Sequence, residues 1–148
     1  MVRGSCLCGE IAFEVDEPGI AALVACYCVN CRKLSGAQFG VYLQVRRDAF
    51  RWLSGEDKVQ TFESSPGNLR GRCRTCGSIA PIVTKYGAVR VPGGALDEDP
   101  GVAADVAIYE RSKAEWCGLA TPAQRFEETG PPEYWRAMSA KLMPPSSA

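Results

Sequence analysis

The sequence predicts a single, mainly β domain followed by a short C-terminal helix, and three observations support this class. Apolar and polar residues alternate in segments 10–15 and 39–45, with the period of a strand that buries one face. Turn-forming pairs of Pro, Gly and Ser separate these segments from other apolar ones. The 148 residues, 46% of them hydrophobic and 23% charged, have the composition of one globular domain.

The strands are predicted from this alternation, which is clearest in two places. In the first segment, Ile11, Phe13 and Val15 share one face. The second segment repeats the pattern with Phe39, Val41, Leu43 and Val45. Including the weaker candidates, we expect strands at 10–15, 21–26, 39–45, 57–62, 79–85, 88–92 and 105–109.

Helices are expected in only two places. Residues 29–34 can form one or two turns, and residues 132–143 can form a terminal helix with a proline in its first turn. The last residues, 144–148, are expected to be disordered. The chain is thereby divided into a domain at 1–130 and a helical tail at 131–148.

The charge balance and the absence of histidine exclude several functional classes. Seventeen Lys and Arg residues balance 17 Asp and Glu residues, so no basic excess points to nucleic acid or to an anionic membrane as a partner. With no histidine, the chain cannot contain a Ser-His-Asp triad, a Cys-His pair or an HExxH zinc site. Any metal or acid–base chemistry must use other side chains.

Eight cysteines are the most informative residues. The first residues lack the basic stretch and apolar run of a signal peptide, and the apolar segment 20–26 is too short to cross a bilayer. We therefore expect a cytoplasmic protein. In a reducing compartment, clustered cysteines indicate metal binding or thiol chemistry rather than disulfides.

Two of the cysteine clusters are pairs directly followed by glycine, Cys6-Leu-Cys8-Gly9 and Cys73-Arg-Thr-Cys76-Gly77. Neighbouring sulfurs on a tetrahedral zinc ion lie roughly 3.8 Å apart, whereas alternate residues of a strand lie about 6.6 Å apart. Each pair must therefore sit in a turn, which a glycine with positive φ allows. Together the two pairs predict a closed four-cysteine zinc site.

The middle cluster, Cys26-Tyr-Cys28-Val-Asn-Cys31, supplies only three sulfurs. Three protein ligands with one open position are typical of a catalytic zinc site. Alternatively, Cys28 and Cys31 form a redox pair at a helix start, or the thiols are inert. Cys117 is expected to be a buried free thiol, with a fourth ligand for the middle site as the alternative.

The ordered motifs resemble the glutathione-dependent formaldehyde-activating enzyme family, which includes centromere protein V. The matching segments are Gly4-Ser-Cys-Leu-Cys-Gly9, Cys26-Tyr-Cys-Val-Asn-Cys-Arg-Lys-Leu-Ser-Gly36, Arg72-Cys-Arg-Thr-Cys-Gly-Ser78 and Gly94-Ala-Leu-Asp97. The resemblance implies an Mss4-like β-tent fold stapled by a structural zinc at the outer pairs. It also implies a second zinc on the middle cluster, near a bound glutathione or similar thiol.

An open zinc site with three thiolates suits activation of an incoming thiol. We therefore expect a carbon–sulfur lyase-type enzyme acting on adducts of a glutathione-like thiol with a small aldehyde. The alternative is a non-enzymatic, zinc-stabilised binding module. For proton transfer the candidates are Tyr27, Tyr42, Asp97 and water, although Tyr42 also suits strand packing and Asp97 also suits a turn.

Basic residues near the clusters have expected roles as well. Arg32, Lys33 and Arg47 could receive the carboxylates of a bound thiol. The alternating arginines at 70, 72 and 74 are expected on one strand edge, where they offset the charge of the outer zinc site. Family members commonly have His at the position of Tyr27, so this chain differs there from the family pattern.

Overall fold

The structure, a computed structural model, describes residues 1–103, 105–117, 127, 129 and 131–142. It contains two compact units, Met1–Ala114 and Glu115–Ala148. In the second unit, helix α2 covers Pro132–Leu142, which confirms the expected C-terminal helix as far as residue 142. Residue 143 and the segment 144–148, expected to be disordered, lie outside the described residues. The division expected at residue 130 stays a prediction.

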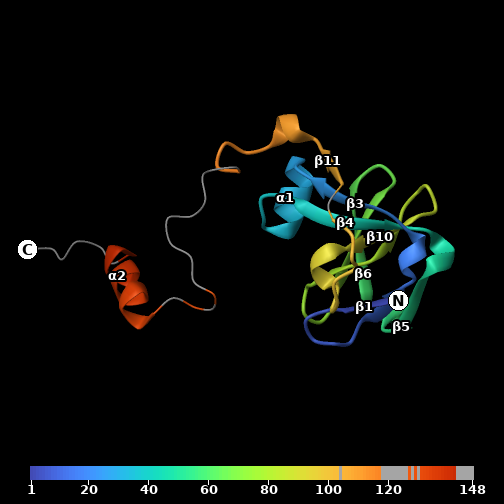
Figure 1. The fold of residues 1–148 in the computed structure, drawn as a ribbon, viewed down its shortest axis with the longest axis horizontal. Coiled ribbons are helices and arrows are strands. Elements are labelled where there is room, and N and C mark those ends of the chain that lie inside the picture. Colours follow the sequence, from blue (N-terminus) through green and yellow to red (C-terminus); the bar gives the residue numbers. More distant parts are fainter. Residues whose placement is uncertain (104, 118–126, 128, 130, 143–148) are drawn as a thin grey trace, which may run out of the picture. The chain divides into compact units, whose positions relative to one another are not determined.

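The first unit is mainly β, as the sequence predicts (Figure 1). Its described strands are β1 (Val2–Ser5), β2 (Ala12–Val15), β3 (Ile20–Cys26), β4 (Gly40–Val45), β5 (Phe50–Ser54), β6 (Val59–Ser65), β7 (Asn68–Cys73), β8 (Ile79–Ala80), β9 (Ile82–Val83), β10 (Val89–Pro92) and β11 (Val106–Ile108). Helix α1 covers Val29–Ser35. Short 3-10 turns lie at Glu17–Gly19, Arg47–Ala49, Glu56–Lys58, Gly93–Ala95 and Glu110–Ser112.

These strands form three sheets. Their orders are β1-β2-β5, β11-β3-β4-β10-β9 and β6-β7-β8. Neighbouring strands run antiparallel, except that β11 lies parallel to β3. The central strands of the five-stranded sheet, β3, β4 and β10, lie side by side in Figure 1.

One face of the five-stranded sheet forms the main hydrophobic core. Leu43 of β4 and Val91 of β10 are opposite each other in the register and fully buried. They pack in one cluster with Phe13 of β2 and Phe50 of β5. The predicted alternation is therefore correct for Leu43 and Val45, whose packing attaches the first sheet to the second. Phe39 lies outside β4 and packs on Tyr27 instead.

The other face of this sheet is polar. Because side chains alternate along a strand, Tyr42, Gln44 and Arg90 point away from the core. Val24 and Cys26 of β3 lie opposite Tyr42 and Gly40 and share this face. All five line one cavity, which is described below.

The sequence analysis did not predict β1 or β5. In β1, Gly4 has low strand propensity, yet it is needed because a Cβ there would lie 2.3 Å from the Phe13 ring. In β5 only Phe50 and Trp52 alternate, although their edge-to-face contact at 4.9 Å helps to pack the strand. The strand expected at 79–85 is divided into β8 and β9 around Pro81, which has no N–H to donate.

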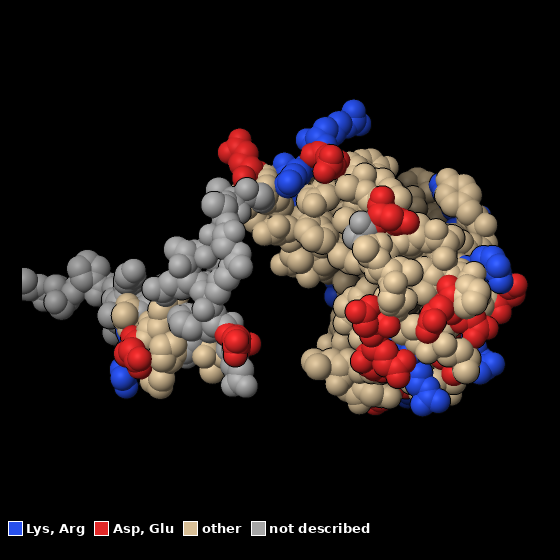
Figure 2. Space-filling model, viewed as in Figure 1, with Lys and Arg blue, Asp and Glu red and all other residues tan. Residues whose placement is uncertain are grey.

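The surface of the first unit carries both signs of charge. On the face shown in Figure 2, acidic and basic side chains lie intermixed. Among the described residues, no helix is long and apolar enough to cross a membrane.

Candidate metal centres

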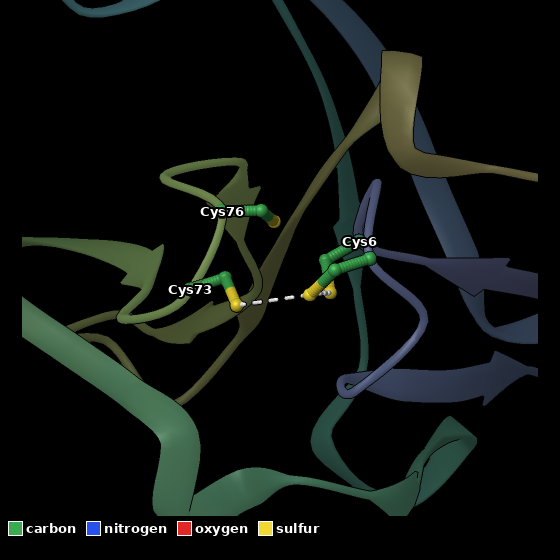
Figure 3. Close-up of side chains that lie close together, drawn as sticks. Cys6, Cys73 and Cys76 are labelled. Carbon is green, nitrogen blue, oxygen red and sulfur yellow. Dashed lines mark hydrogen bonds between the residues drawn. The ribbon is translucent and has the colours of Figure 1, made fainter.

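The two outer cysteine pairs meet at one point in the structure. Cys6 and Cys8 lie in the turn between β1 and β2. Cys73 is the last residue of β7, and Cys76 lies in the turn that leads from β7 to β8. The four sulfurs lie within 4.8 Å of one another. The Cys6–Cys8 sulfur distance is 3.4 Å and the Cys8–Cys73 distance is 3.8 Å, close to the edge of a tetrahedral zinc–sulfur site. Figure 3 shows the side chains converging from the two turns.

The glycine after each pair closes its turn, as predicted. Gly9 and Gly77 both have φ of 76°, a left-handed conformation that costs glycine little. Each donates its backbone N–H to the carbonyl of the first cysteine in its own turn, Cys6 or Cys73, at 2.9 Å. The two turns thus have similar geometry despite their different cysteine spacing.

Polar groups around the outer cluster hold negative charge on sulfur. The hydroxyl of Ser78, 3.2 Å from the Cys76 sulfur, and the Ser78 backbone N–H lower the pKa of Cys76 to about 5. For Cys8, the backbone N–H of Glu10 acts to lower the pKa, but hydrogen-bonded neighbouring thiols, first Cys6, and burial raise it to about 12. Cys8 and Cys76 thus differ in pKa although their sulfurs belong to one cluster of four, and it is this donor set that suits a metal cation.

The middle cluster also assembles in the structure. Cys26 ends β3, Cys28 is the N-cap of α1, and Cys31 lies in the first turn of that helix. Their sulfurs lie within 4.8 Å of one another, and among the described residues no further Cys, Asp or Glu ligand atom joins them. We refer to these three residues as the triad.

The local fold fixes the triad and differentiates its thiols. The backbone N–H of Cys31 donates to the Cys28 sulfur at 3.4 Å. Burial acts to raise the pKa of Cys28, but this N–H and the neighbouring thiols lower it overall. For Cys26, burial and then the Cys31 thiol raise the pKa to about 12. Three sulfurs gathered in this way could hold a metal ion and leave one coordination position open.

A cavity of about 330 Å³ lies beside the triad. A larger cavity of about 730 Å³ adjoins the triad cavity, and Tyr42 lines both of them. The Tyr42 hydroxyl is buried and has no hydrogen-bond partner among the residues that the structure describes. Burial, followed by the charge of Cys31, raises the pKa of Tyr42 above its ordinary value, while Arg70 and Arg90 act in the opposite direction.

Two of the proton-transfer candidates, Tyr27 and Asp97, do not line the triad cavity. The Tyr27 ring packs on Phe39 at 5.0 Å and below the Lys113 ammonium at 5.4 Å, and Tyr27 does not line the triad cavity. Asp97 accepts a hydrogen bond from the Ser5 hydroxyl at 2.8 Å and lines the larger cavity. Neither is placed beside the triad cavity as Tyr42 is.

Comparison with known proteins assigns the fold and the family. Residues 1–112 match the family model described as glutathione-dependent formaldehyde-activating enzyme. The chain belongs to this family. A Rhodobacter sphaeroides protein with a known crystal structure, a structural-genomics target, shares the fold with a TM-score of 0.55 and 21% identity. That similarity covers 71% of this chain and 97% of the other. No curated protein matches the chain.

Family membership indicates a glutathione-related, formaldehyde-activating role, and the two cysteine clusters fit metal sites of the kind that the motifs predict.

Two residues of the triad cavity were given little or no role from the sequence: Tyr42 had less weight than other candidates, and Arg90 had no site role. A signal for both existed: in an alternating strand, residues between core positions line the opposite face. Arg70, expected near the outer cluster, instead lines the triad cavity.

Arg72 connects the two cysteine clusters. Its Nη1 donates to the carbonyl of Gly77, in the outer-cluster turn, at 3.0 Å. Its Nη2 donates to the carbonyl of Leu34, near the end of the helix that carries Cys31, at 2.9 Å. A single guanidinium group therefore ties α1 to the outer cluster.

We predict that serine substitutions in the two clusters have different effects. Cys76→Ser should remove a ligand of a closed site and lower the free energy of unfolding by about 3 kcal/mol or more, because structural metal binding is coupled to folding. Cys28→Ser should lose about one metal equivalent with the fold retained. Metal analysis and thermal unfolding measure both; equal effects of the two substitutions would contradict separate closed and open sites.

We also predict that Arg72→Gln destabilises the protein by about 1 kcal/mol, because two hydrogen bonds from a partly solvated guanidinium are lost. The triad should release its metal to a chelator faster in this variant, since α1 is held less firmly. The matched control is Arg74→Gln, which changes an exposed arginine two residues further along, in the turn after β7. If the two variants unfold and lose metal alike, Arg72 does not connect the clusters.

Proposed function

We propose that this chain is a zinc-dependent carbon–sulfur lyase-type enzyme that forms and cleaves adducts of a glutathione-like thiol with a small aldehyde. One observation carries the proposal: three clustered cysteine sulfurs border a cavity that could admit a fourth ligand. The family assignment supports the glutathione and formaldehyde specificity. A structural zinc would be held by Cys6, Cys8, Cys73 and Cys76, and the catalytic one by the triad.

The residues fit zinc because both donor sets consist of cysteine sulfur, at separations compatible with tetrahedral coordination. A zinc ion bound by the triad would supply a Lewis acid that lowers the pKa of an incoming thiol. The half-buried Cys28 borders the cavity together with buried Cys26 and Cys31. The triad therefore presents its open side where a ligand can enter.

The reaction is an addition and its reverse. The thiolate sulfur forms a bond to the carbonyl carbon of the aldehyde, the π electron pair moves to oxygen, and the oxygen takes up one proton. Cleavage returns the proton and breaks the same carbon–sulfur bond. Negative charge develops on the aldehyde oxygen, so a fixed hydrogen-bond donor beside it would lower the barrier.

We propose Tyr42 as this donor. Its hydroxyl is buried in the wall of the triad cavity and has no protein partner. A buried hydroxyl without a partner costs stability, so retaining it suggests that a ligand supplies the missing hydrogen bond. Tyr42 would hold the aldehyde oxygen while the triad cavity holds the thiol.

The remaining expectations are part of the same proposal. A cytoplasmic location would keep the cysteines reduced, as metal binding requires. A small thiol is the expected partner, rather than a nucleic acid or a membrane. Cys117 is a buried residue of the second unit, and its role stays a prediction. The competing function, a non-enzymatic module stapled by zinc, needs no thiol at the triad.

The test is a comparison of glutathione with S-methylglutathione by calorimetry on zinc-loaded protein. Glutathione should bind at least about tenfold more tightly, because the methylated sulfur cannot become a thiolate. Cys28→Ser should abolish this difference. Equal affinities, or no binding of either ligand, would leave the binding module as the better account.

Substitution of two tyrosines tests which side chain donates a hydrogen bond to the aldehyde oxygen. Tyr42→Phe should slow formation of the glutathione–formaldehyde adduct about tenfold or more, because the oxyanion loses its donor, while stability is unchanged or increased. Tyr27→Phe is the matched control, since the Tyr27 ring packs on Phe39 and does not line the cavity. A rate loss confined to Tyr27→Phe would reverse the assignment. Rates and thermal unfolding measure the two effects separately.

A further inference from the structure

We infer that Arg70 and Arg90 form an anion subsite in the triad cavity, which selects thiols that carry a carboxylate. The inference rests on the proposed function and adds a substrate class to it. The proposed subsite is the positively charged part of the cavity lining, whereas the sulfurs carry negative charge when ionised. None of the metal ligands belongs to it.

The cavity has two chemically different sets of lining groups. The triad contributes three sulfurs, while β7 and β10 contribute the guanidinium groups of Arg70 and Arg90. Neutral polar side chains complete the lining: Asn30, Gln44, Ser65 and Asn68. No Asp or Glu of the described chain lines it. A ligand with a sulfur at one end and an anion at the other would match both sets.

Neither arginine has an acidic partner among the described residues. The ion pairs found there join the N-terminus to Glu17, Arg46 to Asp48, and Arg51 to Glu14. Arg70 donates its Nε to the Ser64 hydroxyl at 3.0 Å, which orients the guanidinium but does not neutralise it. Arg90 has its Cζ 5.8 Å from the centre of the Tyr42 ring. Both side chains are half-buried, so their charge is only partly solvated.

A second observation independently points to a missing ligand. Tyr42 is only 5% exposed and lies between the triad and Arg90, yet its hydroxyl has no hydrogen-bond partner. Among the described residues, the same cavity therefore contains a buried hydroxyl without a hydrogen-bond partner and two guanidinium groups without an acidic partner. Buried polar groups are normally satisfied, so a bound polar molecule would complete this cavity.

A carboxylate fits this subsite better than a phosphate. Guanidinium groups bind carboxylates through paired N–H donors, and this geometry needs only one negative charge. Three thiolates on a divalent cation leave a net charge of about −1, which would repel a doubly charged phosphate more strongly than a carboxylate. The volume of about 330 Å³ admits a short thiol acid, or the thiol-bearing part of a larger one.

The experiment measures binding of three small thiols to zinc-loaded protein by calorimetry. 3-Mercaptopropionate carries a carboxylate, 2-mercaptoethanol is neutral and cysteamine is cationic. The acidic thiol should bind about tenfold more tightly than the neutral one, and the cationic thiol should bind most weakly. In Arg90→Gln and Arg70→Gln, the preference for the acid should fall to about twofold or less.

Arg32, Lys33 and Arg47, which the sequence led us to expect as carboxylate partners, do not line the cavity. The matched control is therefore Arg47→Gln, which removes an exposed arginine and should leave the preference intact. Circular dichroism checks that each variant is folded, and the three thiols on unmodified protein test the subsite even if a variant is not. Equal binding of acidic and neutral thiols would overturn the subsite while preserving thiol binding at the triad. A preference that persists in both variants would indicate carboxylate chelation by the metal and would also overturn it. Absence of binding by all three thiols would overturn the proposed function itself.

Discussion

The structure depends on the close approach of cysteine sulfur atoms. These sulfurs repel one another once they are ionised. In the outer cluster, Cys8 and Cys73 come from turns far apart in the chain, and their sulfurs lie 3.8 Å apart. Two thiolates at that distance repel by about 4 kcal/mol at an effective dielectric constant of about 20. A bound cation would convert this repulsion into attraction and tie the β1–β2 turn to the β7–β8 turn. Formation of the cluster thus joins two of the three sheets.

The alternation of side chains in the five-stranded sheet then separates stability from chemistry. Leu43 and Val91 face the core, where they pack with Phe13 and Phe50. Tyr42 and Arg90, one position away in each strand, face the triad cavity. Because the core side is tightly packed, the side chains on the cavity side are held by a rigid backbone. Arg72 adds a link between α1 and the outer cluster, so both clusters belong to one framework.

The sequence was sufficient to predict whatever depends on local pattern. Cysteine pairs with trailing glycines predicted the outer cluster, the close spacing of three cysteines predicted the triad, and alternation predicted β4 and the core positions Leu43 and Val45. Partnerships between distant segments were not predictable in this way. Gly4 suits a strand only because the Phe13 ring comes so close, and Arg70 lines the triad cavity only because of how its sheet packs. Tyr27 adjoins the triad in sequence, but its ring is held by Phe39, so adjacency in the chain was a poor guide to position.

The central claim is that the chain holds one closed and one open sulfur site, and X-ray absorption at the zinc edge tests it most directly. The first equivalent of zinc should show four sulfurs at about 2.3 Å. The second should show three sulfurs and one lighter atom at about 2.0 Å, and glutathione should replace that atom with a fourth sulfur. Uptake of only one equivalent would contradict the account, as would a second site with four sulfurs before any thiol is added.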